Sequence, residues 1–182
     1  MRNAEDLERL IRNVPDFPRP PVVFKDITTI LTEPGALGDA VTLLERRTAS
    51  IRYDAVASIE SRGFVFGAVL AERRGLPLVL VRKPGKLPAE TIGEDYDLEY
   101  GSARIEMHKG SLPSGTRVFV VDDLVATGGS ALAACRLVER DGGIVAGAGF
   151  IVNLEFLGGR ARLEDAGYQV GFVIRVDSEQ PV

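Results

Sequence analysis

The chain has 182 residues, of which 45% are hydrophobic and 26% charged, a composition that suits one globular domain with a sizeable core. Its 22 basic and 26 acidic residues give a net charge of −4, so the bulk charge favours neither nucleic acid nor an anionic membrane as partner. No apolar run approaches the ~20 residues that span a bilayer and the N-terminus lacks a signal peptide's apolar core, so we expect a cytoplasmic protein.

Helices and strands alternate in the first half of the chain. A short amphipathic helix is predicted over residues 3–12, and an extended proline-rich stretch over 14–24. The next predicted elements are a helix at 36–49, a strand at 54–59, a helix at 63–74 and a strand at 77–81. Residues 84–98 show no strong periodicity and predict an exposed, mobile excursion.

The second half continues the alternation. The predicted elements are strands at 99–107 and 118–121, a helix at 131–140, a strand at 143–152, a helix near 159–166 and a strand at 168–175. This pattern is typical of a parallel sheet covered on both faces. We therefore predict an α/β fold, with a central parallel sheet and helices on both faces, as a single domain over residues 1–182. The one cysteine, Cys135, is expected to pack inside a helix and fits a reducing cytosol.

Residues 118–130, VFVVDDLVATGGS, are the most informative segment. A buried strand is expected to end at two adjacent carboxylates, Asp122 and Asp123, before a small-residue loop and a helix. The amides and hydroxyls of the loop suit a phosphate, and the nearby acids suit ribose hydroxyls, which together favour a phosphoribosyl ligand. A strand-to-helix turn with two solvated acids is the alternative. The loop residues are Ala126, Thr127, Gly128, Gly129 and Ser130.

This segment resembles the PRPP-binding motif of the type I phosphoribosyltransferases, PRPP being 5-phosphoribosyl 1-diphosphate. The resemblance implies that Asp122 and Asp123 hold the 2′- and 3′-hydroxyls while residues 126–130 wrap the 5′-phosphate. The motifs G-x-x-x-x-G-K-[ST], G-x-G-x-x-G and G-x-S-x-G are absent. The one histidine, His108, cannot assemble a triad or a histidine metal site and is interpreted as a surface residue.

Three further polar segments carry candidate site residues. Residues 60–62 stand at a strand-to-helix turn whose amides suit an anion, although an ordinary capped turn explains them about as well. The cations of residues 82–86 suit a departing diphosphate, with a solvated basic patch as the alternative. An acid at the end of the irregular segment would reach the site if that segment closed, but alone it would more often be a surface acid. The side chains concerned are Glu60, Ser61, Arg62, Arg82, Lys83, Lys86 and Glu99.

Five segments resemble the adenine phosphoribosyltransferase family in order and spacing: PPVVFKDIT (20–28), ESRGFVFG (60–67), RKPGKLP (82–88), LEYG (98–101) and VDDLVATGGS (121–130). The resemblance implies purine salvage by the reaction adenine + PRPP → AMP + diphosphate. It also implies the type I fold with a small N-terminal hood over the base site. In that fold residues 1–34 are the N-terminal helix and hood, and residues 84–100 are a mobile catalytic loop. Further implications are Mg²⁺ bound through PRPP oxygens, without direct side-chain ligands, and a homodimer.

The resemblance also assigns roles to single residues. It implies a cis peptide between Glu60 and Ser61, and a purine-proton role for Glu99. The residues implied at the diphosphate are Glu60, Ser61, Arg62, Arg82, Lys83 and Lys86, of which Arg62 and Arg82 join Glu99 as catalytic residues. The residues implied at adenine are Val23 and Lys25, through their backbone, and Phe24 and Leu154, which sandwich the ring.

The chain departs from the family pattern at Ser130, usually threonine, at Thr29, often proline, and at Asn153, where glutamate is common in the base pocket. No lysine follows Lys109, whereas enzymes for 6-oxopurines generally place one on the strand after the PRPP loop. Backbone carbonyls suffice for the amino group of adenine. The alternatives are a phosphoribosyltransferase for xanthine or a 6-oxopurine, and a PRPP-sensing regulator. The acidic charge and the lack of an added DNA-binding domain weigh against the regulator.

Overall fold

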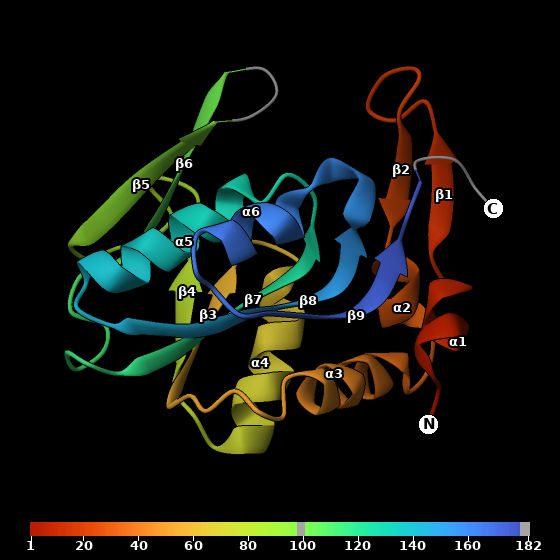
Figure 1. Ribbon diagram of the computed structural model, residues 1–182. Helices are drawn as coiled ribbons and strands as arrows, with labels where there is room; N and C mark the ends of the chain where they lie inside the picture. The colour runs from red at the N-terminus through yellow and green to blue at the C-terminus, as the bar shows by residue number, and fades with distance from the viewer. Residues whose placement is uncertain (98–100, 179–182) are drawn as a thin grey trace.

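The computed structural model describes residues 1–97 and 101–178 of the chain. Within these ranges the centre is a five-stranded sheet in which every neighbouring pair is parallel, in the order β4-β3-β7-β8-β9 (Figure 1). Its strands are β3 (Ala55–Ile59), β4 (Leu78–Val81), β7 (Arg117–Val125), β8 (Ile144–Leu154) and β9 (Val170–Val176). Strand β3 is buried along its whole length, as expected for a strand covered on both faces.

Helices cover both faces of this sheet, which confirms the predicted α/β architecture (Figure 1). One face packs against a hydrophobic cluster that includes Leu44 and Phe66, and the other against a cluster that includes Leu137 and Leu163. The helices of the first face are α3 (Ala36–Arg47) and α4 (Gly63–Arg74), and those of the second are α5 (Gly129–Arg140) and α6 (Gly159–Asp165).

The strand order reverses between β3 and β7. The chain leaves β3 through α4 to reach β4 on one side, and leaves β7 through α5 to reach β8 on the other. The two connections therefore diverge to opposite faces and open a crevice at the carboxyl ends of β3 and β7. In open α/β sheets, ligands bind in a crevice of this kind.

The N-terminal segment forms a small separate sheet. Helix α1 (Ala4–Glu8) is shorter than the predicted helix over 3–12, because residues from Arg12 onward pair with another strand. Strands β1 (Arg12–Pro15) and β2 (Val23–Asp26) are antiparallel, and we call residues 12–26 the N-terminal hairpin. The short helix α2 (Thr28–Thr32), which the sequence pattern did not predict, leads from it to α3.

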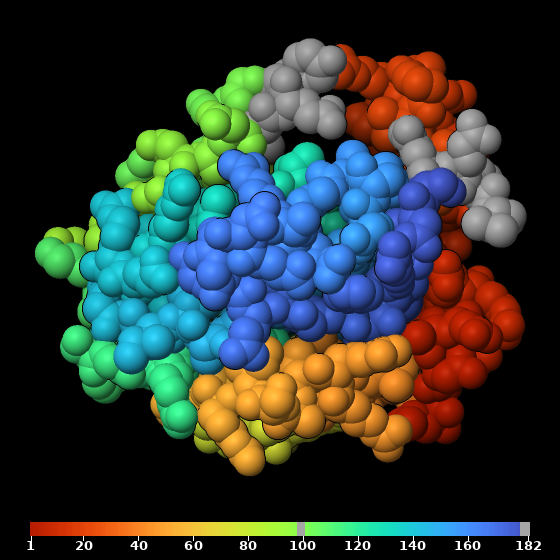
Figure 2. Space-filling view, in the orientation of Figure 1, coloured from red at the N-terminus to blue at the C-terminus, as the bar shows by residue number. Residues whose placement is uncertain are grey.

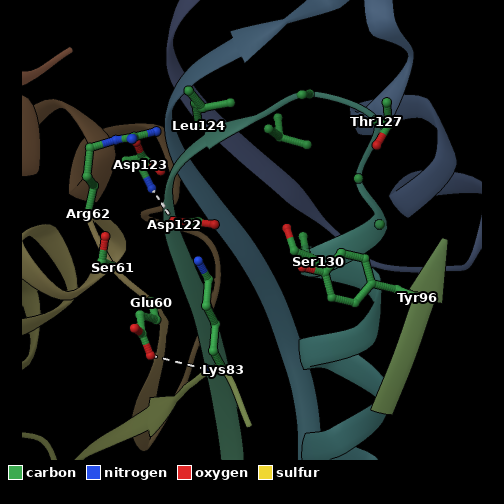
Figure 3. Close-up of a pocket in the computed structure, with 15 residues that line it drawn as sticks. Glu60, Ser61, Arg62, Lys83, Tyr96, Asp122, Asp123, Leu124, Thr127 and Ser130 are labelled. Carbon is green, nitrogen blue, oxygen red and sulfur yellow. Dashed lines mark hydrogen bonds and ion pairs between the residues drawn. The ribbon is translucent and has the colours of Figure 1, made fainter. Parts of the chain in front are cut away.

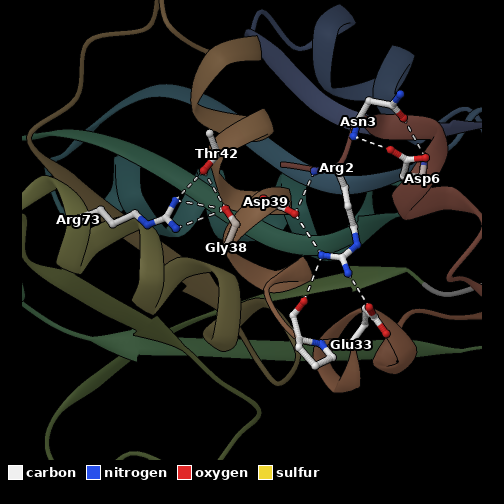
Figure 4. Close-up of polar contacts among 9 residues, drawn as sticks. Arg2, Asn3, Asp6, Glu33, Gly38, Asp39, Thr42 and Arg73 are labelled. Carbon is white, nitrogen blue, oxygen red and sulfur yellow. Dashed lines mark hydrogen bonds and ion pairs between the residues drawn. The ribbon is translucent and has the colours of Figure 1, made fainter.

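Arg2 fastens the start of the chain to the main body (Figure 4). Its backbone N–H donates to Asp39 Oδ2 at 3.0 Å, and its Nη2 lies 2.5 Å from Glu33 Oε1. Its Nη1 also donates to the Pro34 carbonyl at 3.1 Å. Contacts from the backbone and the side chain of Arg2 therefore hold the start of the chain beside α3.

The prediction of irregular chain over residues 84–98 was wrong for residues 91–97. They form strand β5 (Thr91–Asp97), which pairs antiparallel with β6 (Ser102–His108). Their sequence shows no clear alternation because most of the strand is half-buried on both sides. The β5–β6 pair and the N-terminal hairpin project at the same end of the molecule, near opposite edges of the central sheet (Figures 1 and 2).

Three smaller features complete the fold. Strand β7 continues past the predicted end at 121 to Val125, because it stays paired with β8 after β3 has ended. His108, interpreted as a surface residue rather than a catalyst, is half-buried in β6, and its Nε2 has no hydrogen-bond partner among the described residues. A 3-10 turn, η1 (Glu155–Leu157), follows β8. No helix of the described ranges has the length and hydropathy needed to cross a membrane.

Candidate active site

A cavity of about 370 Å³ opens at the carboxyl ends of β3 and β7, where the strand order reverses (Figure 3). It brings together most of the side chains that the sequence singled out. Its lining residues are Glu60, Ser61, Arg62, Lys83, Tyr96, Asp122, Asp123, Leu124, Val125, Ala126, Thr127, Gly128, Gly129, Ser130 and Ala131.

The two carboxylates lie inside β7 rather than after it. They follow Val121, the last residue of β7 that pairs with β3, so that side of the strand is open to the cavity. Asp122 and Asp123 are 8% and 5% exposed, and Asp123 forms an ion pair with Arg62. Burial, and next the adjacent Asp123, raises the pKa of Asp122 well above its ordinary value. Two packed carboxylates of this kind are strong acceptors for paired hydroxyl groups.

The loop between β7 and α5, residues 126–130, is held in place from outside the cavity. A Cβ at Gly159 would lie 2.2 Å from the Ala126 carbonyl oxygen and 2.6 Å from the Gly128 nitrogen, so α6 approaches the loop backbone closely. Gly128 has φ +78, which only glycine adopts freely. The loop presents its amides and the N-terminal end of α5 to the cavity, an arrangement that favours anions.

Residues 60–62 form the opposite wall. The peptide between Glu60 and Ser61 is cis, as the resemblance implied. Gly63 begins α4 directly beside the acids, since a Cβ there would lie 2.6 Å from Asp122 Oδ1. The close approach places the first turn of α4 and the side chain of Arg62 against β7.

The three predicted cations do not all face the cavity. Lys83 points into it (Figure 3), whereas Arg82 Nε lies 3.0 Å from Glu60 Oε2 and its Nη1 donates to the Lys86 carbonyl at 3.1 Å. Lys86 itself is exposed and outside the lining. Burial works against ionisation of Glu60, but hydrogen bonds from Lys83 N–H and Arg82 outweigh it and lower the pKa of that carboxyl.

The residues implied at adenine lie outside the cavity lining, and one of them, Phe24, lies beside the lining residue Arg62. Val23, Phe24 and Lys25 belong to β2, and Leu154 is the last residue of β8. The Arg62 guanidinium carbon lies 6.0 Å from the Phe24 ring centroid, which joins the N-terminal hairpin to the cavity wall. Lys25 is 7% exposed, and its Nζ donates to Asn13 Oδ1 at 2.8 Å across the hairpin.

Asn153, the departure from the family pattern, is fully buried at the end of β8. Its Nδ2 donates to Glu155 Oε2 at 2.5 Å, and its Oδ1 has no hydrogen-bond partner among the described residues. Glu155 also meets Arg160 Nη2 at 3.1 Å. The amide therefore orders the segment that leads from Leu154 to α6.

Glu99 lies outside the described residues, so its predicted role has no structural test here. The sequence reading missed Tyr96, which reaches the cavity from β5, because residues 91–97 were not recognised as a strand. It also passed over Leu124, Val125 and Ala131, whose apolar side chains gave no chemical signal. An aromatic residue three positions before a candidate catalytic acid was the available clue to Tyr96.

Comparison with known proteins places this geometry in a family. The model of the phosphoribosyl transferase domain matches residues 27–169. An adenine phosphoribosyltransferase of Rubrobacter xylanophilus is 52% identical over 169 residues, covering 93% of this chain and 91% of that protein. This chain belongs to the adenine phosphoribosyltransferase family. A relative with the same name from Gloeobacter violaceus is 52% identical over 92% of this chain and 98% of its own length.

Solved structures of the adenine phosphoribosyltransferase family share the fold. The enzyme of Thermoanaerobacter pseudethanolicus superposes with a TM-score of 0.91 at 44% identity, covering 96% of this chain and all of that one. The Saccharomyces cerevisiae enzyme, solved with an imino-altritol bisphosphate and adenine, has a TM-score of 0.85 at 37% identity and covers 93% of this chain and 97% of its own. The type I fold expected from the resemblance is thus confirmed.

Proposed function

We propose that this protein transfers the 5-phosphoribosyl group of PRPP to adenine and releases AMP and diphosphate, a reaction of purine salvage. The observation that carries the proposal is one cavity holding two buried carboxylates and a helix-start loop at the strand-order reversal. Family membership supports the same chemistry. The runner-up, a phosphoribosyltransferase for xanthine or a 6-oxopurine, differs only in the base.

The phosphoribosyl group fits the β7 side of the cavity. Asp122 and Asp123 accept hydrogen bonds from the 2′- and 3′-hydroxyls, and residues 126–130 surround the 5′-phosphate with amides and hydroxyls. Arg62 holds Asp123 in position through their ion pair. These contacts fix the sugar carbon that reacts, because both ends of the ribose are bound to one rigid strand and helix.

The diphosphate fits the wall formed by residues 60–62 and Lys83. The amides after β3 and the Lys83 ammonium face the same space as the carboxylates (Figure 3). Arg82 bonds to Glu60 in this structure, so its contact with diphosphate requires that it leave that carboxylate. Lys86, which is exposed, would approach by the same movement of the segment after β4.

Mg²⁺ fits this arrangement through the oxygens of PRPP. The carboxylates of Asp122 and Asp123 adjoin the ribose hydroxyl site, and hydroxyl and phosphate oxygens are the hard ligands that Mg²⁺ prefers. When bound, the ion supplies positive charge that stabilises the departing diphosphate. The protein's own part is to orient the sugar and hold both phosphate ends.

Adenine is placed between the cavity and the N-terminal hairpin. The backbone of Val23 and Lys25 reads the edge of the base, and Phe24 and Leu154 enclose its ring. Support comes from the position of Phe24 beside Arg62, and from a base strand without lysine. An amino group is a donor and needs only backbone carbonyls, whereas enzymes for 6-oxopurines generally place a lysine on this strand, and β8 carries none.

Glu99 is proposed to accept or relay the proton that adenine loses when N9 bonds to the sugar. It follows Asp97, the last residue of β5, by two positions, and the neighbouring Tyr96 lines the cavity. A carboxylate within hydrogen-bond reach of a ring nitrogen contributes about 10²–10⁴-fold to such a step. The proposed catalytic loop, residues 84–100, includes strand β5, so the closure that brings Glu99 there and excludes water is proposed for the loop residues outside that strand.

The deciding experiment is a base panel. Purified protein with PRPP and Mg²⁺ receives adenine, hypoxanthine, guanine and xanthine in parallel, and each nucleotide product is quantified. AMP should form far faster than any other product. Comparable turnover of hypoxanthine contradicts the adenine assignment, and binding of PRPP with no turnover of any base favours the regulator.

We also propose a cytoplasmic homodimer made of one domain per chain, with residues 1–34 as helix and hood. Exposed apolar side chains support the dimer: Leu80 on the outer strand β4 is 36% exposed, and it borders a groove of about 510 Å³ that includes Leu87. Light scattering coupled to size exclusion should give twice the 19.6 kDa chain mass. Leu80→Glu should shift the species toward monomer, and a monomeric wild type rules the dimer out.

A further inference from the structure

Tyr96 reaches the phosphoribosyl side of the cavity from an element that no part of the PRPP motif includes. It belongs to β5, and its ring extends across the cavity toward Ser130 (Figure 3). A Cβ at Gly129 would lie 3.1 Å from Tyr96 Cδ2 and 3.1 Å from the Asp97 carbonyl oxygen. The end of β5 therefore packs directly on the first residue of α5, at the point where the loop amides face the cavity.

Independent contacts at the far end of α5 hold β5 in this position. Arg140 Nη1 donates to the Gly93 carbonyl at 2.8 Å and lies 2.7 Å from Glu94 Oε2. Arg136 Nη1 lies 3.6 Å from Glu94 Oε1. The strand is thus attached to both ends of α5, along which it runs in Figure 1. Its placement over the loop does not depend on Tyr96 alone.

The phenol is a hydrogen-bond donor without a protein partner in the part of the chain that the structure describes. No hydrogen bond of its hydroxyl is formed there, although the ring lines the cavity with Asp122 and Ser130. Burial, and next the charge of Asp122, raises the pKa of Tyr96, so the hydroxyl keeps its proton at neutral pH. The tyrosine thus shares the cavity with the carboxylates proposed for the ribose and the loop proposed for the 5′-phosphate.

We propose that Tyr96 contacts the phosphoribosyl ligand, donating a hydrogen bond from its hydroxyl to an oxygen between the ribose and the 5′-phosphate, while its ring covers the loop. The inference rests on the proposed function of the cavity and adds a ligand-binding residue to it. The oxygen concerned takes no part in bond making, so the contact is equal in the ground and transition states. Its loss should therefore weaken PRPP and AMP binding with little change in kcat.

The test compares Tyr96→Phe with wild type, and with Tyr168→Phe as a matched control. Tyr168 lies outside the cavity, where its hydroxyl bonds Glu139 Oε2 at 3.1 Å. Tyr96→Phe should raise the KM for PRPP, and the Kd of AMP and of ribose 5-phosphate, by about tenfold. The kcat and the KM for adenine should stay within about twofold, and Tyr168→Phe should leave all of them unchanged.

A fluorescence titration gives a second readout. The chain contains no tryptophan, so Tyr96→Trp introduces a single reporter at the cavity. Ribose 5-phosphate should change its emission, and adenine alone should not. An unchanged Kd for ribose 5-phosphate in Tyr96→Phe, together with a silent Tyr96→Trp, overturns the inference while a wild type that makes AMP keeps the proposed function. A wild type that makes no AMP overturns the proposed function instead, whatever the tyrosine variants do.

Discussion

The proposed phosphoribosyl side and the proposed base side of the site are built in different ways. The first occupies one contiguous segment, β7 and the loop to α5, whose acids are less than a tenth exposed and rest on the central sheet. The second joins β2 of the N-terminal hairpin to the end of β8, which lie about 130 residues apart in the chain. A contiguous, buried arrangement is rigid, whereas the base side depends on how a small outer sheet is attached.

The two sides also differ in how they shift the pKa of a carboxyl group. Burial raises the pKa of Asp122 on the phosphoribosyl side. On the base side, hydrogen bonds from Thr28 and next from Arg12 lower the pKa of Asp26, at the end of the N-terminal hairpin, to about 2. The ionised form of Asp122 destabilises the folded state, and its carboxylate is proposed to bind ligand hydroxyls. The ionised form of Asp26 instead stabilises the N-terminal hairpin.

The largest effect should fall on the residue proposed to act between the two sides. Glu99→Gln keeps size and hydrogen bonding but removes basicity, so kcat should fall by about 10²–10⁴-fold with adenine binding little changed. Steady-state kinetics with saturating PRPP measure it. If Glu99 instead anchors the closed loop, Glu99→Gln is mild and Glu99→Leu severe. Near-normal turnover in Glu99→Gln rules out proton transfer.

Next come the carboxylates of the phosphoribosyl side. Asp122→Ala and Asp123→Ala each remove a charge-assisted acceptor for a ribose hydroxyl, which costs about 1.5–3 kcal/mol, roughly ten- to a hundredfold in kcat/KM for PRPP. Asp123→Ala also leaves Arg62 without its ion-pair partner. Both variants should keep their adenine affinity, measured by calorimetry. Wild-type kcat/KM in folded single variants would sink the assignment of the ribose site.

A substitution on α6 should test whether the phosphoribosyl side depends only on β7 and the loop to α5. Gly159→Ala forces a Cβ to within 2.2 Å of the Ala126 carbonyl oxygen, so the loop between β7 and α5 must shift. Overpacking of this kind costs about 1–3 kcal/mol of stability, and PRPP affinity should fall about tenfold. Urea unfolding and ligand titration report the two effects. Gly38→Ala on α3 is the control, since its Cβ meets only the flexible end of Arg73 at 3.2 Å.

The base side should respond to Phe24→Ala in adenine binding alone. Stacking of a base on an aromatic ring contributes about 1–3 kcal/mol, so the KM for adenine should rise roughly five- to a hundredfold. The Kd for ribose 5-phosphate serves as the internal control and should not change, because the carboxylates and the loop are untouched. Equal weakening of both ligands would show that the N-terminal hairpin supports the whole cavity rather than the base alone.

The difference between the two sides also explains what the sequence could predict. The acids, the loop and the start of α5 follow one another, so local pattern and phosphate chemistry placed them together. Phe24 and Leu154 belong to β2 and β8, elements far apart in the chain, and a family resemblance was needed to pair them. Strand β5 escaped notice because its burial shows no alternation, and Tyr96 was lost with it. The orientation of Arg82 toward Glu60 depends on a tertiary contact that the sequence spacing does not predict.

The smallest expected effect is the loss of stability at low pH through Asp26, which holds the N-terminal hairpin. Asp26 Oδ1 accepts from Thr28 N–H at 2.9 Å and from Thr28 Oγ1 at 2.6 Å, and Arg12 bonds its other oxygen. Its folded pKa of about 2 lies below the ordinary 3.8, so the ionised form favours the folded state. That stability is complete above pH ~4 and disappears as the pH falls toward ~2.

The pKa shift of Asp122 has the opposite sign to that of Asp26. Its raised pKa means that ionisation opposes folding, so protonation relieves the folded state as the pH falls through that pKa. Asp26→Asn should therefore lower the free energy of unfolding in urea at pH 6 and lower it less near pH 2.5, where wild-type Asp26 has begun to lose its charge. Asp122→Asn should do the reverse and raise stability most at neutral pH, because it removes a buried charge. Parallel pH profiles for the two variants would mean that the two sides of the site do not differ in their electrostatics.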